Sequence, residues 1–198
     1  MIKRTIFFCL ILVGAGCQEV VFSPKPRGYP RVIYPEKKYQ PFDEDYCAFT
    51  FEYPQYCVIQ QDTAFFDEKP AHPCWFDIYY PDFDSRIYCS YYPITAENSL
   101  DKLKTDAFKM SDWHLKKATY KEEIPFRKNN DVRGMIFEVE GPVASHLQFY
   151  LTDSLGERHF LRGAVYFHTQ ARPDSLAPVF QFVKKDVEHL LETFSWTE

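Results

Sequence analysis

Asp153, Ser154 and His159 place a carboxylate, a hydroxyl and an imidazole close together in the sequence, and these are the residue types of a serine hydrolase. The stretch Thr152-Asp153-Ser154 also fits a turn at the end of a strand, where Asp and Ser side chains bond backbone groups. The chain has no G-x-S-x-G elbow and no Gly-rich phosphate loop that would support catalysis. We therefore expect a structural turn and a protein that is not an enzyme, with a hydrolase as the least favoured alternative.

The histidines do not form a metal-binding pattern. No two of them are four residues apart, as a pair on successive turns of a helix would be, and H-E-x-x-H is absent. Glu138 and Glu140 share one face of a predicted strand, which is better explained as a solvated face than as a carboxylate pair. We expect no metal ion and no cofactor. The histidines concerned are His72, His114, His146, His159, His168 and His189.

Aromatic residues make up 18% of the chain and suggest a binding site of another kind. A cleft between the sheet and a helix would let Trp75, Trp113 and Tyr166 act as stacking platforms for a glycan or a lipid. The leading expectation is a surface that contacts other proteins, because residues 160–167 alternate between two largely apolar faces. The expected contact residues on the strands are Gln148, Thr152, Asp153, Ser154, His159 and Arg162.

The first residues have the pattern of an export signal. Lys3 and Arg4 precede an apolar run, residues 5–13, that is too short to span a ~30 Å hydrocarbon layer. Three small residues then lead into Cys17, as in a bacterial lipoprotein processing site. We predict a signal peptide over residues 1–16 and a lipid-modified Cys17, which acyl chains at ~0.8 kcal/mol per buried CH₂ would anchor. The alternative is an ordinary signal peptide that leaves Cys17 as a thiol.

Residues 17–45 are expected to form an extended tether, because prolines and cations punctuate the stretch and favour polyproline II. The cations fit a plain spacer near anionic headgroups, or a strip in which Arg27, Tyr29 and Arg31 dock a partner protein. Residues 46–198 are expected to form a single domain, since 45% apolar content suits one core. The net charge of −5 argues against nucleic acid as a partner.

The hydrophobic pattern predicts an α+β domain. Short aromatic and β-branched runs predict strands, and apolar residues at three- and four-residue steps predict two amphipathic helices. Runs of strands with few helices favour an antiparallel sheet of about seven strands with both helices packed on it. The predicted elements are strands 48–53, 56–60, 75–80 and 86–91, paired antiparallel, a helix over 97–118, strands 133–140, 145–153 and 159–168, and a helix over 176–194.

Two resemblances follow from these residues. The element order, with Phe194-Ser195-Trp196 after the last helix and Phe51-Glu52-Tyr53-Pro54 early in the chain, resembles a Mog1/PsbP-type sandwich. The lipoprotein start and a series of short motifs resemble the gliding motility lipoprotein GldD family over essentially the whole mature chain. These motifs are Pro24-Lys25-Pro26-Arg27-Gly28-Tyr29, Tyr34-Pro35, Lys38-Tyr39, Phe49-Thr50-Phe51-Glu52, His114, Lys117-Ala118, Gly141, Ala144-Ser145, Gln148-Phe149, Thr152-Asp153-Ser154, His159-Phe160, Gly163 and Val165-Tyr166-Phe167.

The resemblance to GldD implies a cell-envelope lipoprotein that is needed for gliding motility and for the linked type IX secretion machinery. It implies lipid anchoring in the outer membrane, on the periplasmic face or at the cell surface. Other gliding and secretion components of the envelope are the implied partners, and the membrane is contacted through the lipid alone. Neither catalytic activity nor a cofactor comes with the family.

Four cysteines remain once Cys9 leaves with the signal and Cys17 carries lipid, and four cysteines allow three pairings. The family pattern has cysteines at the positions of Cys47 and Cys74. The resemblance therefore implies a Cys47–Cys74 bridge that closes about 28 residues and stabilises the fold by roughly 3 kcal/mol. Cys57 and Cys89 depart from the family pattern, and a second bridge between them is expected.

Overall fold

The computed structural model describes residues 31–63, 70–129, 131–168 and 173–197. The chain from Val32 onward forms one compact unit. The boundary expected at residue 46 is therefore too late, because strand β1 (Tyr39–Phe42) pairs antiparallel with β2 (Phe49–Pro54) and Phe42 is buried in the core. Burial of this large aromatic ring outweighs the extended, solvated conformation that the local composition favours.

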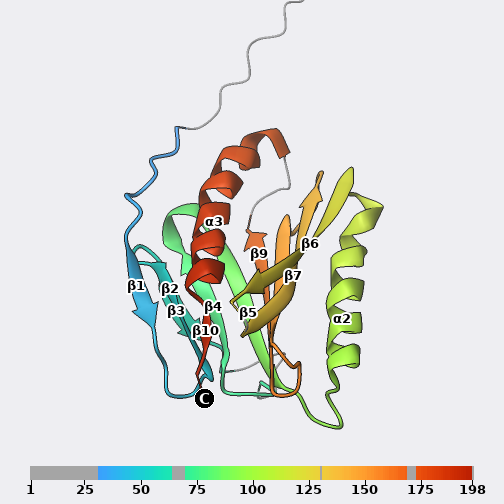
Figure 1. The fold of residues 1–198 in the computed structure, drawn as a ribbon. Helices are drawn as coiled ribbons and strands as arrows, with labels where there is room; N and C mark the ends of the chain where they lie inside the picture. The colour runs from blue at the N-terminus through green and yellow to red at the C-terminus, as the bar shows by residue number, and fades with distance from the viewer. Residues whose placement is uncertain (1–30, 64–69, 130, 169–172, 198) are drawn as a thin grey trace, which may run out of the picture. The chain divides into compact units, whose positions relative to one another are not determined.

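A seven-stranded antiparallel sheet forms the centre of the unit, in the order β3-β4-β5-β9-β8-β7-β6 (Figure 1). Strand β4 pairs antiparallel with β3 and with β5, and the strands from β6 to β9 pair in chain order. The two halves meet where β5 pairs with β9. The strands are β3 (Val58–Gln61), β4 (Trp75–Tyr80), β5 (Ser85–Pro93), β6 (Tyr120–Lys128), β7 (Val132–Glu140), β8 (Leu147–Asp153) and β9 (His159–Phe167).

Strand β2 does not join the seven-stranded sheet. It lies between β1 and β10 (Ser195–Trp196) in a three-stranded sheet, so the prediction that residues 48–53 pair with the next three strands is wrong. The sequence patterns also missed β6, which is polar and contains Pro125. An edge strand bonds only one neighbour, so it tolerates proline and charged side chains that a central strand would exclude.

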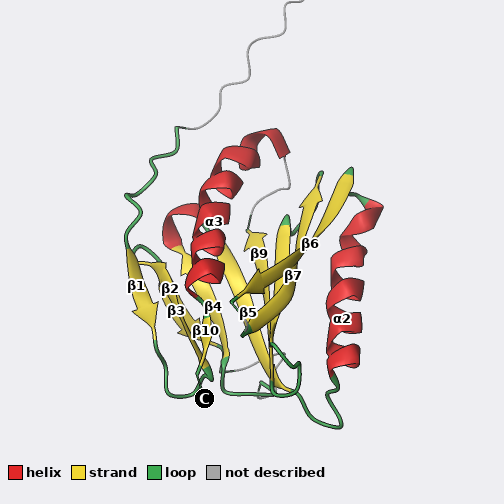
Figure 2. Ribbon diagram, viewed as in Figure 1, coloured by secondary structure: helices red, strands yellow, loops and turns green. Residues whose placement is uncertain are grey.

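The two helices cover opposite faces of the large sheet, which confirms the predicted α+β architecture (Figure 2). Helix α3 (Pro173–Thr193) packs on the face that holds the larger core, and α2 (Leu100–Asp112) packs on the other face over a smaller cluster. Strand β8 runs between them, and all seven of its residues are buried. Its predicted alternation is confirmed, since Phe149 belongs to the larger core while Tyr150 packs in the cluster under α2.

Helix α2 is shorter than the helix predicted over residues 97–118. It begins after Ser99, whose Oγ accepts a hydrogen bond from the Lys102 backbone N–H at 3.4 Å. Ser99 and Lys102 have the S-x-x-K spacing of some serine hydrolases, but here the serine is an N-cap. The α-helix ends at Asp112 and continues as a 3₁₀ turn, Trp113–Lys116. A helix of this length covers only part of the sheet face beneath it.

Candidate functional site

The part of the sheet that α2 leaves uncovered is formed by β4, β5 and β9. In β4, the inward-facing residues are buried and the outward-facing Trp75, Asp77 and Tyr79 are only half-buried. This alternation shows that one face of the strand packs in the core while the other is reached by solvent. The uncovered face adjoins the C-terminal end of α2, and the two together form a groove.

Two adjoining cavities make up this groove, which we call the α2 groove. One has a volume of about 750 Å³ and lies along α2, and the other has a volume of about 640 Å³ and lies over the strands. Both volumes fall in the range of sites for small molecules. The residues that line both cavities are Tyr92, Met110, Trp113 and Arg162.

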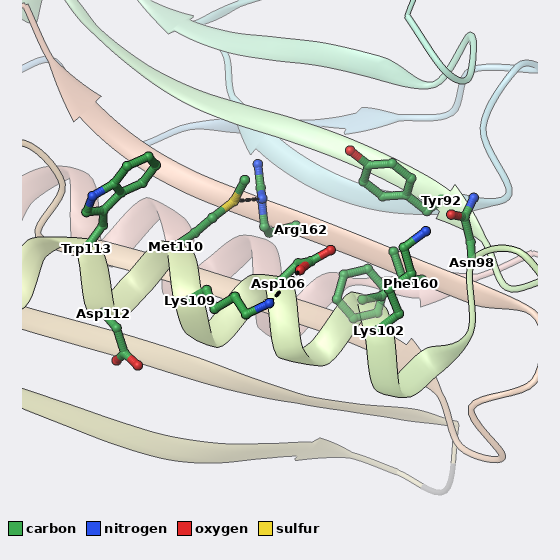
Figure 3. A pocket seen from close by; sticks show the side chains of 11 residues that line it. Tyr92, Asn98, Lys102, Asp106, Lys109, Met110, Asp112, Trp113, Phe160 and Arg162 are labelled. Atoms are coloured by element: carbon green, nitrogen blue, oxygen red, sulfur yellow. Dashed lines mark hydrogen bonds and ion pairs between the residues drawn. The ribbon is translucent and has the colours of Figure 1, made fainter.

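Trp113 is the most prominent side chain of the α2 groove. It is 76% exposed, and it also lines a third cavity of about 530 Å³ beside His114 and Ala144. Figure 3 shows Trp113 at one end of the cavity along α2 and Tyr92 at the other, with Met110 and Arg162 between them. An indole ring exposed to this extent at the mouth of a cavity is available to stack against a ligand.

The strand side of the groove is lined by pairs of aromatic rings. Trp75 and Tyr92 make an edge-to-face contact with ring centroids 5.4 Å apart, and Tyr88 and Tyr166 make another at 5.6 Å. The Trp75 indole N–H donates to the Tyr91 carbonyl oxygen at 3.0 Å, which fixes the plane of the ring. These ring contacts and the Trp75 hydrogen bond hold the aromatic side chains of this wall in fixed positions beside the cavity.

Polar groups of the strand cavity are held in place by burial and by one ion pair. The Arg86 guanidinium lies 3.1 Å from the Asp77 carboxylate. Burial nevertheless dominates and raises the pKa of Asp77 to about 6, with Arg86 opposing the rise. Gln148 is 3% exposed, and its Nε2 has no hydrogen-bond partner among the described residues. Leaving a buried N–H donor without an acceptor destabilises the fold by ~1–3 kcal/mol. A ligand that accepts a hydrogen bond from Gln148 would remove this cost.

The structure brings together the three aromatic residues named in the binding-module alternative. Trp75, Trp113 and Tyr166 all line the strand cavity, together with Gln148 and Arg162 from the expected contact residues. Sequence patterns did not identify Asp77, Tyr88 or Met110 as members of this site. Asp77 and Tyr88 lie on strands and Met110 lies on α2, so their place in one site depends on the strand order and on the position of the helix.

Thr152, Asp153 and Gln148 do not form an exposed contact surface, which corrects the expectation for these three residues. Each is at most 6% exposed, as all residues of β8 are buried, although Gln148 still lines the strand cavity. The Asp153 carboxylate accepts hydrogen bonds from the backbone N–H groups of Glu157, Arg158 and His159 at 2.9–3.2 Å. Burial opposes ionisation of Asp153, but these three bonds outweigh it and lower the pKa of the carboxyl.

His159 is likewise engaged in the fold. Its Nδ1 lies 2.7 Å from the Tyr91 hydroxyl, and its ring stacks on Trp196 with centroids 4.9 Å apart. Burial lowers the pKa of His159. No hydrogen bond in the described part of the chain joins this imidazole to Ser154, so the hydrolase alternative lacks its nucleophile–base contact. The turn that follows β8 is built by Asp153 as a backbone cap.

The structure contains the Cys47–Cys74 disulfide that the family resemblance implied, with Cα atoms 5.1 Å apart. The expected Cys57–Cys89 bridge is wrong, because both residues are buried free thiols. Cys57 lies beside Tyr80, which pairs with Ser85, whereas Cys89 is four residues farther along β5. Four strand residues span ~13 Å, well beyond disulfide reach. Burial raises the pKa of both thiols.

Several predicted features lie outside the described residues, namely the signal peptide, Cys17, Arg27 and Tyr29. Arg31 is described and exposed. Within the described residues, no group of three or more His, Cys, Asp or Glu side chains is placed to hold a metal ion. None of the described helices has the length and apolar character needed to cross a membrane.

The fold and the groove define an α+β domain with a ligand-sized aromatic cleft on one face of its sheet. The family model of the gliding motility lipoprotein GldD matches residues 19–196, and the chain belongs to this family. No curated protein matches the sequence. Among solved structures, the solution structure of cyanobacterial PsbP (CyanoP) from Synechocystis sp. PCC 6803 is similar, at 12% identity and a TM-score of 0.47, covering 86% of this chain and 99% of that one.

Several motifs on which the GldD resemblance rests meet around the end of α2. His114 and Lys117 line the third cavity with Ala144, and His114 and Gln148 line the strand cavity. Gly141 has a φ of +117°, and a Cβ there would lie 2.9 Å from the Lys117 carbonyl oxygen. The loop that follows β7 thus closely approaches the segment after the 3₁₀ turn, and motifs far apart in the sequence border one surface.

Proposed function

We propose that this protein is a lipid-anchored component of the outer membrane that serves gliding motility and the linked type IX secretion machinery by binding, without catalysing a reaction. The observation that carries this proposal is the match to the gliding motility lipoprotein GldD over residues 19–196, which includes nearly the whole compact unit. The chemistry of the molecule supports a binding role, because Asp153 of the hydrolase alternative acts as a backbone cap and the half-buried His159 ring stacks on Trp196.

Anchoring through Cys17 would leave the compact unit free to meet partners in the envelope. Residues between Cys17 and Val32 supply at most ~3.3 Å per residue of reach, or about 50 Å when extended. The proposed partners are other envelope proteins of gliding and secretion. Arg27, Tyr29 and Arg31 remain the proposed protein-contact strip, since they combine two cations and an aromatic ring in a proline-rich segment.

Deletion of the gene in the source organism tests this proposal. We expect loss of spreading on a surface together with loss of secretion through the type IX pathway, and restoration of both by the intact gene. A Cys17→Ser copy should not restore either and should leave the protein out of the outer-membrane fraction. A deletion strain that glides and secretes normally would contradict the proposal.

Capture of partners tests the contact strip separately. Crosslinking in intact cells, followed by purification of the tagged protein, should recover envelope proteins of the motility apparatus. An Arg27→Glu, Arg31→Glu double variant should recover less of them. Lys38→Glu, at an exposed ion pair with Glu36, is the matched charge reversal and should leave recovery unchanged. Equal recovery by the double variant and the wild type would remove the strip from the proposal.

A further inference from the structure

The α2 groove is nearly balanced in charge. Three cations and four carboxylates line its two cavities, so neither sign dominates the groove. A site for a strongly charged ligand would concentrate the opposite charge. The groove therefore fits an uncharged ligand better than a phosphate or a polyamine. The charged residues are Lys102, Lys109 and Arg162, and Asp62, Asp77, Asp106 and Asp112.

Hydrogen-bonding groups of both kinds reach the same cavity as the aromatic rings. Gln148 brings an unpaired buried N–H donor, and no ion pair in the described part of the chain includes Arg162, which contacts Met110 Sδ. Asp77 brings carboxylate oxygens that accept. A ligand that satisfies this set must donate and accept hydrogen bonds and must also offer a flat apolar surface to Trp113 and Tyr166.

We propose that the α2 groove is a binding site for a neutral oligosaccharide. A pyranose ring has an apolar face of C–H groups, which would stack on Trp113, and a rim of hydroxyls, which would bond Gln148, Arg162 and Asp77. The volumes of the two adjoining cavities, about 750 and 640 Å³, allow a short chain of sugars to run from one into the other past Met110. This inference rests on the proposed binding role of the protein and adds the class of its ligand.

Other ligand classes fit the groove less well. An acyl chain would cover the Asp77 and Arg162 charges and the Gln148 amide without bonding any of them, and burial of unpaired polar groups is costly. The strand edge nearest the cavity is β3, a four-residue strand, which offers an extended peptide little backbone to pair with. An oligosaccharide brings its own hydroxyls and needs no backbone partner.

Isothermal titration of the full-length protein, in a detergent without a sugar headgroup, tests the proposal. The probes are maltotriose, cellotriose and triacetylchitotriose, with palmitate and a tyrosine-rich hexapeptide as probes of the other classes. At least one trisaccharide should bind with a Kd below about 1 mM and shift the tryptophan emission. Failure of all three trisaccharides to bind, or binding of palmitate or the peptide in their place, would overturn the proposal.

Variants locate the site. Trp113→Ala should weaken trisaccharide binding by about tenfold or more, because an aromatic stacking platform is lost. Leu155→Ala is the matched control, since Leu155 is also 76% exposed and lies outside the α2 groove. It should bind as the wild type does. Equal binding by wild type and Trp113→Ala would overturn the assignment of the sugar to this groove.

Gln148→Leu separates ligand binding from folding. Removal of the buried Nε2–H donor, which has no partner among the described residues, should leave the denaturation midpoint of the free protein unchanged or raised, while the trisaccharide affinity falls. A lowered midpoint with unchanged affinity would overturn the role of Gln148. The motility proposal is contradicted by a different result, a deletion strain that still glides. A protein that binds no sugar but is required for gliding would therefore contradict only the oligosaccharide proposal.

Discussion

The Lys37 ammonium lies 2.6 Å from the Asp186 carboxylate, across 149 residues of sequence. The Asp186 side chain is fully buried in α3, where it also accepts hydrogen bonds from the hydroxyls of Tyr39 and Tyr56 at 2.9 and 2.7 Å. Burial and the neighbouring Asp186 charge raise the pKa of both tyrosines, which keeps them protonated as donors. The segment before β1 is thereby joined to the last helix.

Lys37→Met is expected to lower the free energy of unfolding by about 3 kcal/mol, because it leaves the Asp186 charge buried without its cation. Lys38→Met is the matched control, since Lys38 pairs with Glu36 on the surface and both side chains are more than half exposed. The control should change stability by less than about 0.5 kcal/mol. Urea unfolding followed by tryptophan fluorescence measures both. Equal stability of the two variants would show that the buried pair contributes nothing.

Asp153→Ala should destabilise the fold by about 2 kcal/mol at pH 7, because three backbone N–H groups lose their acceptor. Ser154→Ala, one residue along the same turn, should change stability little. The folded pKa of Asp153 is lowered, so its stabilisation is present above the unfolded value near 4 and is lost as pH falls through the folded value. The difference between Asp153→Ala and wild type should therefore shrink in acid. A constant difference from pH 7 to pH 2 would contradict this assignment.

The Asp77 carboxyl is expected to give the free energy of unfolding a pH dependence opposite to that given by Asp153. Its folded pKa is raised to about 6, so the folded state binds a proton more tightly than the unfolded chain between about pH 4 and 6. The free energy of unfolding of the wild type should fall, relative to that of Asp77→Asn, as pH rises through this interval. Urea unfolding at pH 4 and pH 7 for both proteins measures the effect. Parallel pH dependence of the two proteins would show that the carboxyl is not shifted.

The cysteines give a prediction that is independent of function. Non-reducing peptide mapping should find Cys47 and Cys74 in one linked pair, and should find Cys57 and Cys89 alkylated only after denaturation, because both thiols are buried and their pKa values are raised. A Cys47→Ala, Cys74→Ala double variant should lose about 3 kcal/mol of stability. Cys57 linked to Cys89 in the map would contradict the structure.

The α2 groove shows where local patterns stop being informative. The aromatic residues Trp75, Trp113 and Tyr166 could be named as stacking platforms from their types alone, but their meeting in one cavity depends on β5 pairing with β9 and on α2 ending at Asp112. Asp77 carried no signal of its own, because its raised pKa arises from burial in the folded chain. The Cys57–Cys89 bridge was predicted wrongly because the separation of the two thiols depends on strand pairing, which the local sequence does not give.

Residue types and local patterns were enough to predict the α+β class, the alternation within β8, the two amphipathic helices and the resemblance to the GldD family. These properties follow from residue types and from hydrophobic periods of two and 3.6 residues, which can be recognised within a short segment of the chain. The folded chain was needed to show that β2 leaves the main sheet, that Lys37 neutralises Asp186 and that one sheet face stays open beside α2. Such long-range contacts depend on the summed packing of many side chains, and no local period encodes that sum.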